Sequence, residues 1–147
     1  MHRLLITAAV AALVALGLTS AGQAAGGATK VQTRHVALGT ILVDGSGRTL
    51  YLFQKDKSSK STCSGACADA WPPVLTTGKP TSAGSARKSL LSTSKRSDGK
   101  TQVTYNGHPL YRFSGDSKPG QTKGNKVNAF GARWYAVTAA GKRVGGY

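Results

Sequence analysis

The sequence predicts a mainly β protein, in which internally duplicated hairpin units form one small sheet-based domain. Three observations support this prediction: a Tyr-x-Phe-x-x-Asp motif occurs twice, each copy follows a hairpin pattern, and only one short stretch is a candidate helix. That stretch, residues 65–71, lies at a Cys-x-x-x-Cys pair and is stopped by Pro72 and Pro73. One short helical turn is therefore expected there.

The duplication is seen when residues 43–56 are aligned with residues 103–116 at a constant offset of sixty. Internal repetition at a fixed period is a strong signal of architecture. A tryptophan follows each copy, Trp71 and then Trp134, with a three-residue difference in spacing. The aligned identities are Val43/Val103, Gly47/Gly107, Leu50/Leu110, Tyr51/Tyr111, Phe53/Phe113 and Asp56/Asp116.

Each copy is typical of a β-hairpin. The second turns at Asn106-Gly107 between apolar, β-branched flanks, a strong hairpin signal because both turn residues need a positive φ. Pro109 near the start of its strand suits an edge position, and Asp98-Gly99 marks a further turn. The expected strands cover residues 30–38, 40–43, 48–53, 101–105, 108–113 and 133–138.

The repeated motif is interpreted as architecture. Residues two apart in a strand share a face, so each Tyr and Phe should point together. The opposite face grows polar towards the strand end, which favours burial of the aromatic face. Each Asp then follows its strand and can accept backbone N–H bonds from a turn. The alternative is that both Asp residues meet at one catalytic or cation site. The structural motif comprises Tyr51, Phe53, Asp56, Tyr111, Phe113, Asp116, Trp71 and Trp134.

The first 24 residues are typical of a signal peptide. A short basic start precedes fifteen apolar residues (4–18) and a small-residue stretch, with cleavage expected after Ala24 or, alternatively, after Ala21. Fifteen residues are fewer than the roughly twenty that span a bilayer, so no transmembrane segment is expected after removal. No cysteine ends the apolar run, so a lipid anchor is not expected.

The remaining chain divides into segments of one pseudo-duplicated domain. Gly, Ser, Thr and Lys dominate the stretch between the copies, as in a linker or long surface loop. The expected division is a signal peptide (1–24), an N-terminal segment (25–37), a first repeat (38–75), a linker or loop (76–89) and a second repeat (90–147).

The charge is strongly unbalanced, with 20 Lys and Arg against 5 acids, all of them Asp. Loss of the leader removes only Arg3 among charged side chains, so the mature domain keeps about +14. One reading is a solvated surface; the other is adhesion to anionic cell-surface polymers or another polyanion. Sequence-specific nucleic-acid binding is not expected, because no recognition-helix or stacking-platform motif is present.

Several stretches resemble one known family. "GRTLYLF", "CSGACADAWPP", "YNGHPLYRF" and "RWYAV", with the paired Tyr-x-Phe-x-x-Asp units, look like the bacterial secreted-repeat family of small exported proteins and lipoproteins that carries a Y-x-[FWY]-x-x-D motif. The likeness covers about residues 38–140. It implies an extracytoplasmic, duplicated, β-rich module of the cell envelope with no established enzymatic activity. Two departures are the missing lipid-acceptor cysteine and a basic loop after Asp116.

Cys63 and Cys67 are the only cysteines, and an oxidising compartment favours a disulfide between them. Such a bond would hold the loop that presents Trp71. The alternative is a soft-ligand copper site formed by Cys63, Cys67 and His108; otherwise no metal or cofactor is expected. Motifs for nucleotide binding, zinc binding and nucleophilic catalysis are missing from the sequence, so no enzyme activity is predicted.

Two functions of different classes remain. The leading one is a secreted, non-enzymatic binding or structural module of the envelope, whose basic surface favours anionic partners. The alternative is a copper-handling or thiol-redox accessory protein that uses the cysteine pair. The sequence leaves the oligomeric state open.

Overall fold

The computed structural model describes residues 27–146, so the predicted signal peptide lies outside the described residues. Within this range the strands are short and are joined by turns and loops, with one α-helix and one 3₁₀ helix among them. In chain order they are β1 (Lys30–Val36), β2 (Gly39–Asp44), β3 (Tyr51–Phe53), α1 (Ala66–Ala70), β4 (Thr81–Ser82), η1 (Lys88–Leu90), β5 (Leu91–Lys95), β6 (Thr101–Tyr105), β7 (His108–Pro109), β8 (Asn128–Ala129) and β9 (Ala132–Ala136).

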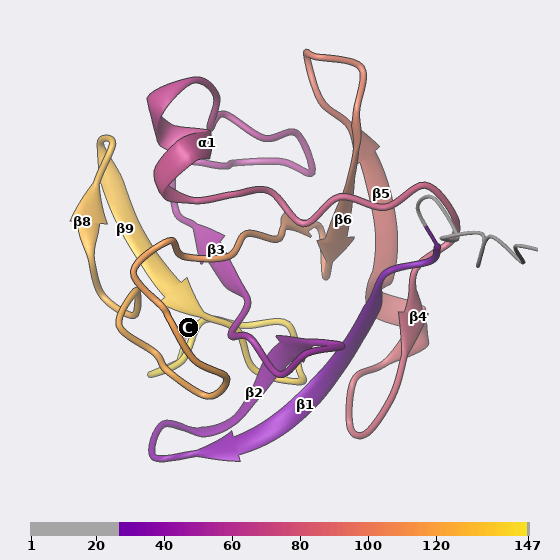
Figure 1. Cartoon of the computed structure of the whole chain (residues 1–147), viewed down its shortest axis with the longest axis vertical. Coiled ribbons are helices and arrows are strands. Elements are labelled where there is room, and N and C mark those ends of the chain that lie inside the picture. Colours follow the sequence, from indigo (N-terminus) through magenta and orange to yellow (C-terminus); the bar gives the residue numbers. More distant parts are fainter. Residues whose placement is uncertain (1–26, 147) are drawn as a thin grey trace, which may run out of the picture.

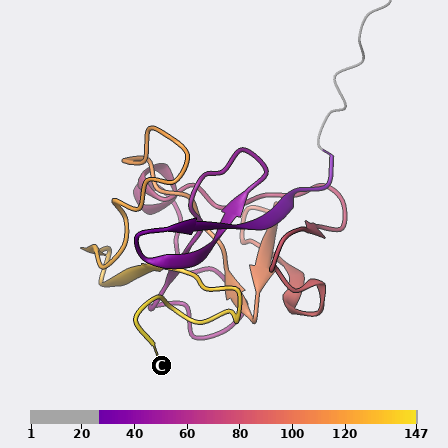
Figure 2. The ribbon, with the colours of Figure 1, turned by 90° about the horizontal axis from the view of Figure 1, so that it is seen from below.

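The mainly β class is confirmed, and the strands of the described chain form three small sheets. Their orders are β2-β1-β4, β3-β9-β8 and β5-β6-β7. In Figure 1, β1 and β2 lie along one side of the molecule, β5 and β6 along another, and β3 runs between them beside β9. Figure 2, seen from below, shows the β1–β2 hairpin lying across that face. Within residues 27–146 the single α-helix is the short one at the cysteine pair, as expected.

The two hairpins that precede the aromatic strands differ by one residue. Asn106 and Gly107 both have positive φ, 50° and 76°, as the Asn-Gly signal predicts. Thr104 pairs with Pro109 across that turn, whereas Val43 pairs with Thr49 across the first. The first loop is therefore one residue longer than the second.

This difference corrects the constant offset of sixty. Leu50 N donates to Leu42 O, and in the second repeat Leu110 N donates to Val103 O, each at 3.0 Å. Val103 thus takes the place of Leu42, not that of Val43, so the offset before the turn is sixty-one. The alignment by identity missed this because two adjacent apolar residues are equally good matches for one valine.

The two repeats exchange their tryptophan-bearing segments. β3 of the first repeat pairs with β9 of the second, and Phe53 lies opposite Trp134. In the matching place, Tyr111 of the second repeat forms an antiparallel bridge with Pro73, which lies just after the first repeat's tryptophan. Each aromatic strand therefore obtains a neighbouring strand from the other repeat.

An approximate two-fold relation lies between these exchanged pairs. Tyr51 and Tyr111 form an antiparallel bridge in which each backbone N–H donates to the other residue's carbonyl, at 2.8 and 3.0 Å. The two motif strands thus meet at equivalent residues. These hydrogen bonds run between the repeats, and the β3-β9-β8 sheet likewise combines strands from both repeats.

The core extends over both faces of β3, which differs from the expectation of one buried aromatic face. Tyr51 and Phe53 are buried on one side, and Leu50 and Leu52 are buried on the other. Leu50 and Leu52 belong to a separate core cluster, whose other members come from both repeats. Phe113, by contrast, is only partly buried.

The segment between the repeats, residues 76–89, contributes to the structure. Within it β4 pairs in parallel with the start of β1, and Pro80 and Ala86 are buried. β1 itself lies in the predicted N-terminal segment and pairs along its length with β2, from Val31↔Asp44 to Val36↔Gly39. Both segments are thus integral to the domain.

Candidate functional site

The repeated Asp residues bind the repeated Tyr residues, and each pair joins the two repeats. Tyr51 donates its hydroxyl to Asp116 Oδ2, and Tyr111 donates its hydroxyl to Asp56 Oδ2, both at 2.6 Å. All four residues are buried. The Tyr and Asp of one motif therefore bind the Asp and Tyr of the other copy. The sequence pattern within one copy does not reveal these contacts.

Each carboxylate also accepts hydrogen bonds from the loop that follows it. Asp56 Oδ1 accepts from the backbone N–H and the hydroxyl of Thr62, at 2.8 and 2.7 Å. Asp116 Oδ1 accepts from the backbone N–H of Lys123 at 3.0 Å. The two acids share no hydrogen-bond partner, so the geometry does not favour a common catalytic or cation site.

The protonation states suit this arrangement. Burial raises the pKa of Tyr51 well above its usual value, and the neighbouring Asp116 carboxylate raises it further. Burial, followed by the Asp56 charge and hydrogen bond, has the same effect on the pKa of Tyr111. Burial also raises the pKa of Asp116, against the opposing effect of the Tyr51 hydroxyl. At neutral pH both tyrosines are therefore neutral hydrogen-bond donors, as the pairs require.

Four aromatic rings from the two repeats form a continuous stack in the core. Trp71 and Trp134 lie face to face, with ring centroids 4.0 Å apart and an interplanar angle of 3°. Phe53 covers the outer face of Trp134 at 3.9 Å, and Phe113 covers Trp71 at 4.3 Å. Each tryptophan thus stacks on the phenylalanine of the other repeat.

Cys63 and Cys67 form a disulfide, as predicted, and neither is a free thiol. The bond closes a short loop before Trp71, for which a chain-entropy argument gives about 2 kcal/mol of stabilisation. With both sulfurs bonded to each other, no thiolate is available for soft-metal binding. His108 lies in a pocket elsewhere, and no cluster of three or more His, Cys, Asp or Glu side chains occurs in residues 27–146. The copper alternative is not favoured.

Most of the Asp side chains are buried and form hydrogen bonds or an ion pair within the fold. Asp44, Asp56 and Asp116 are buried, and Asp44 forms an ion pair with Arg112 at 2.7 Å. Burial alone would raise the pKa of Asp44, but the hydrogen bonds from Arg112, Ser46 and Arg48 lower it below its usual value. Asp69 and Asp98 are the acids that remain exposed in the described chain.

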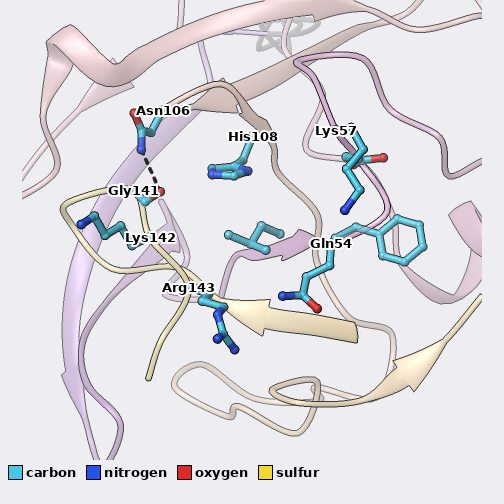
Figure 3. A pocket seen from close by; sticks show the side chains of 10 residues that line it. Gln54, Lys57, Asn106, His108, Gly141, Lys142 and Arg143 are labelled. Atoms are coloured by element: carbon cyan, nitrogen blue, oxygen red, sulfur yellow. Dashed lines mark hydrogen bonds between the residues drawn. The ribbon is translucent and has the colours of Figure 1, made fainter. Parts of the chain in front are cut away.

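A pocket of about 510 Å³ lies where the end of β3, the β6–β7 turn and residues 141–143 meet. Figure 3 shows the His108 imidazole, the Lys57 ammonium and the Gln54 amide on three sides of the same space. Lys142 and Arg143 lie at the rim and point away from the centre. The lining residues are Leu52, Phe53, Gln54, Asp56, Lys57, Asn106, His108, Gly141, Lys142 and Arg143.

The wall of this pocket is fixed by close packing. Asn106 Nδ2 donates to the carbonyl of Gly141 at 3.0 Å. Gly141 has a φ of 76°, and a Cβ there would lie 2.3 Å from Asn106 Cβ, so only glycine fits. The guanidinium of Arg143 lies 4.8 Å from the ring centre of Tyr135. The C-terminal segment is thereby attached to the turn that carries His108.

One known protein family matches both repeats of the chain. A family described as a secreted repeat of unknown function matches residues 32–75 and 92–138, one match for each repeat. The chain belongs to this secreted-repeat family. No curated protein matches it, and no solved structure does. In the described residues no helix is long and apolar enough to cross a membrane.

Sequence reasoning missed the pocket of this secreted repeat. Gln54, Lys57 and the segment 141–143 carry no recognisable motif, and they come together only through the exchange of strands between the repeats. The Asn-Gly turn was a usable signal for one wall, since it placed His108 directly after a defined bend. Lys57 could be located only as the residue that follows the first motif.

Breaking one Tyr–Asp pair of the secreted repeat is expected to show coupling across the repeats. Tyr51→Phe should lower the free energy of unfolding by roughly 1.5–3 kcal/mol, because Asp116 Oδ2 then loses its buried hydroxyl donor. Asp116→Asn should cost less than Asp116→Ala, since an amide oxygen can still accept the Lys123 N–H. Chemical denaturation of the single and double variants would measure this.

The double variant provides the decisive comparison. Tyr51→Phe combined with Asp116→Asn should cost less than the sum of the single changes, with an interaction energy of about 1 kcal/mol or more. Strict additivity would contradict a direct pair between the repeats. A different result would indicate a cation site: a metal ion stabilises the wild-type protein, and Asp116→Asn loses this effect while it remains as stable as the metal-free wild type.

Proposed function

We propose that this protein is a secreted, non-enzymatic module of the cell envelope that attaches to anionic polymers. The family's description as a secreted repeat supports the extracytoplasmic location. The observation that carries the binding role is the distribution of charge between the interior and the surface. The proposal keeps the leading hypothesis from the sequence and gives it a physical basis.

The acids are largely internal, whereas the bases are largely external. Asp44, Asp56 and Asp116 are buried, which leaves Asp69 and Asp98 to offset the cations on the described surface. Asp98 in turn lies 3.6 Å from Arg96. The exposed Lys and Arg residues are Lys30, Arg34, Lys55, Lys57, Lys60, Lys79, Arg87, Lys88, Lys95, Lys100, Lys118, Lys123, Lys126, Arg133 and Lys142. The ratio of basic to acidic side chains is therefore higher on the surface than in the whole chain.

The buried acids also support a binding role over catalysis. Asp56 and Asp116 have each committed both oxygens to hydrogen bonds within the fold. A general acid or base needs a carboxyl group that can reach a substrate. A polyanion needs only a dense array of accessible cations, and its counterions are released on binding.

Binding to polyanions is expected to be strong at low salt and to weaken steeply as salt rises. The domain should be retained on immobilised heparin and on immobilised poly(glycerol phosphate), and should elute at moderate NaCl, because counterion release drives the association. Lys30→Gln, Lys88→Gln and Lys118→Gln should each weaken binding by less than about threefold, since exposed charges beyond a Debye length of about 8 Å act almost independently. A dextran column of equal capacity is the control.

Two results would contradict this electrostatic attachment. One is equal retention on neutral dextran. The other is retention that survives about 1 M NaCl, where the Debye length falls to about 3 Å and exposed charges no longer attract at a distance.

A further inference from the structure

The pocket beside His108 differs from the rest of the basic surface because three of the polar side chains that line it have no hydrogen-bond partner among the described residues. The side chains of Gln54, Lys57 and His108 line one space, and in the described part of the chain none of these side chains forms a hydrogen bond. Elsewhere several cations are engaged; Lys60 Nζ, for example, donates to Lys95 O at 3.0 Å. Unengaged donors around one cavity are what an anionic ligand requires.

The directions of these donors favour a tetrahedral anion. Gln54 and Lys57 follow the end of β3, and His108 lies on the opposite wall at the start of β7. The oxygens of a tetrahedral anion diverge and can accept hydrogen bonds from both walls at once, and a lysine ammonium is a common point-charge ligand of phosphate. In Figure 3 the Arg143 guanidinium points away from the centre, so the central donors are an ammonium, an imidazole and an amide.

The size and lining of the pocket fit more than an isolated ion. A volume of about 510 Å³ lies in the range of small-molecule sites, roughly 300–1,000 Å³. Leu52 and Phe53 add apolar surface beside the polar groups. Asp56 also lines the pocket, but both of its oxygens accept hydrogen bonds from Thr62 and Tyr111. The pocket therefore has room for a phosphate with its adjoining carbon units.

We propose that this pocket binds one phosphodiester group of an anionic polymer, with Lys57 as its charged contact, Gln54 as a neutral donor and His108 as a donor that becomes charged at low pH. The proposal rests on the proposed attachment to polyanions and names the chemical group that one site selects. Lys142 and Arg143 at the rim attract the neighbouring charges of the same polymer. The Asn106–Gly141 contact holds the C-terminal segment against the turn that carries His108 before the ligand arrives.

The site is expected to respond to pH through His108. Burial lowers the pKa of His108 below its usual value, and the Asp56 carboxylate offsets part of this effect. The charged groups that face the pocket with it are Asp56, Lys57, Lys142 and Arg143. A bound anion favours the protonated imidazole, so affinity rises as pH falls through the pKa of His108. A phosphodiester keeps its single charge over this range, so the pH dependence of its binding reports on the protein.

The test uses the mature chain and a soluble poly(glycerol phosphate) fragment as the probe, with inorganic phosphate and a polygalacturonate fragment of equal charge as comparisons. Calorimetry at fixed ionic strength gives the Kd from pH 5 to pH 8. His108→Gln and Lys57→Gln should each weaken binding of the phosphodiester fragment by roughly tenfold, as expected for a lost charged hydrogen bond. His108→Gln should also abolish the rise in affinity at low pH.

Matched controls separate the pocket from the general surface. His35→Gln replaces an exposed histidine on β1, and Lys118→Gln replaces an exposed lysine that does not line the pocket. Both should change the Kd by less than about threefold and leave the pH profile intact. Imidazole resonances in NMR spectra should shift for His108 and not for His35 when the fragment is added.

The outcomes distinguish this inference from the proposed function. If neither polymer fragment binds at low salt, attachment to polyanions is wrong, and the pocket proposal falls with it. If both bind, but His108→Gln and Lys57→Gln behave like the controls, the attachment stands and the pocket proposal is overturned. Equal affinity for polygalacturonate would also overturn the selection of phosphodiesters. Binding of inorganic phosphate alone would indicate a free-phosphate site instead of a polymer site.

Discussion

Separating the two repeats is expected to abolish the folded state of each one. A chain cut in the exposed turn between Gly84 and Ser85 should stay folded, because the hydrogen bonds of β3 with β9 and of Tyr51 with Tyr111 lie away from that turn. After separation in denaturant, neither fragment should regain the near-ultraviolet circular dichroism of stacked tryptophans. That signal needs Trp71 from one fragment and Trp134 from the other, 4.0 Å apart. Mixing the fragments should restore it.

The physical reason is that each fragment lacks the partner strand of its own aromatic strand. Without β9, β3 has unpaired backbone groups and an uncovered Phe53 ring. A buried tyrosine hydroxyl also loses its carboxylate in each half. Such losses exceed the few kcal/mol by which a small domain is stable. The cut but unseparated chain is the control. A cooperative thermal transition in either isolated fragment would contradict the exchanged arrangement.

Replacing Trp134 with alanine should produce one of the largest effects of any single substitution in the core. Trp134 contacts Trp71 on one face and Phe53 on the other, and its indole N–H donates to Ala129 O at 3.0 Å. Truncation of a large buried ring leaves a cavity and typically costs about 3–5 kcal/mol. We expect a loss of this size in chemical denaturation, together with loss of the stacked-tryptophan signal.

A graded series of rings tests whether burial in the stack is the cause. Phe53→Ala should also cost about 3–5 kcal/mol, because that ring is buried. Phe113→Ala should cost clearly less, since that ring is only partly buried at the other end of the stack. Phe130 is 44% exposed, and Phe130→Ala should change the stability by less than about 0.5 kcal/mol. Equal losses for Phe53 and Phe130 would show that the stack does not determine stability.

Local signals in the chain predicted its elements well. The Asn106-Gly107 turn, the strand before it and the short helix at Cys67 occur where the sequence places them. The strand after the turn was expected over residues 108–113, but β7 covers only His108–Pro109. These features depend on the conformational preferences of a few adjacent residues, which the sequence states directly. The short strands β4, β5 and β8 were not predicted. Two-residue strands such as β4 and β8 are too short for an alternating pattern to identify.

The length of the first turn could not be predicted from local sequence patterns. The sequence suggested a constant offset because Val43 and Val103 are identical, yet the hydrogen bonds match Val103 to Leu42. An extra residue in a turn shifts the register by one and moves every preceding side chain to the other face. Identity of residue type could not detect this, since Leu42 and Val43 are both apolar and both buried.

The sequence by itself determined that this protein is a duplicated, disulfide-containing β domain with a large excess of cations. Only the tertiary structure decided that Tyr51 pairs with Asp116 and Tyr111 with Asp56. Both copies carry the same motif, so the sequence does not indicate which aspartate each tyrosine binds. The pairing depends on where the exchanged strands place the side chains. Burial of Asp44, Asp56 and Asp116 was likewise decided by packing, and it leaves the surface more basic than the composition states. The pocket at His108 depends on the same exchange, because its walls come from segments far apart in the chain.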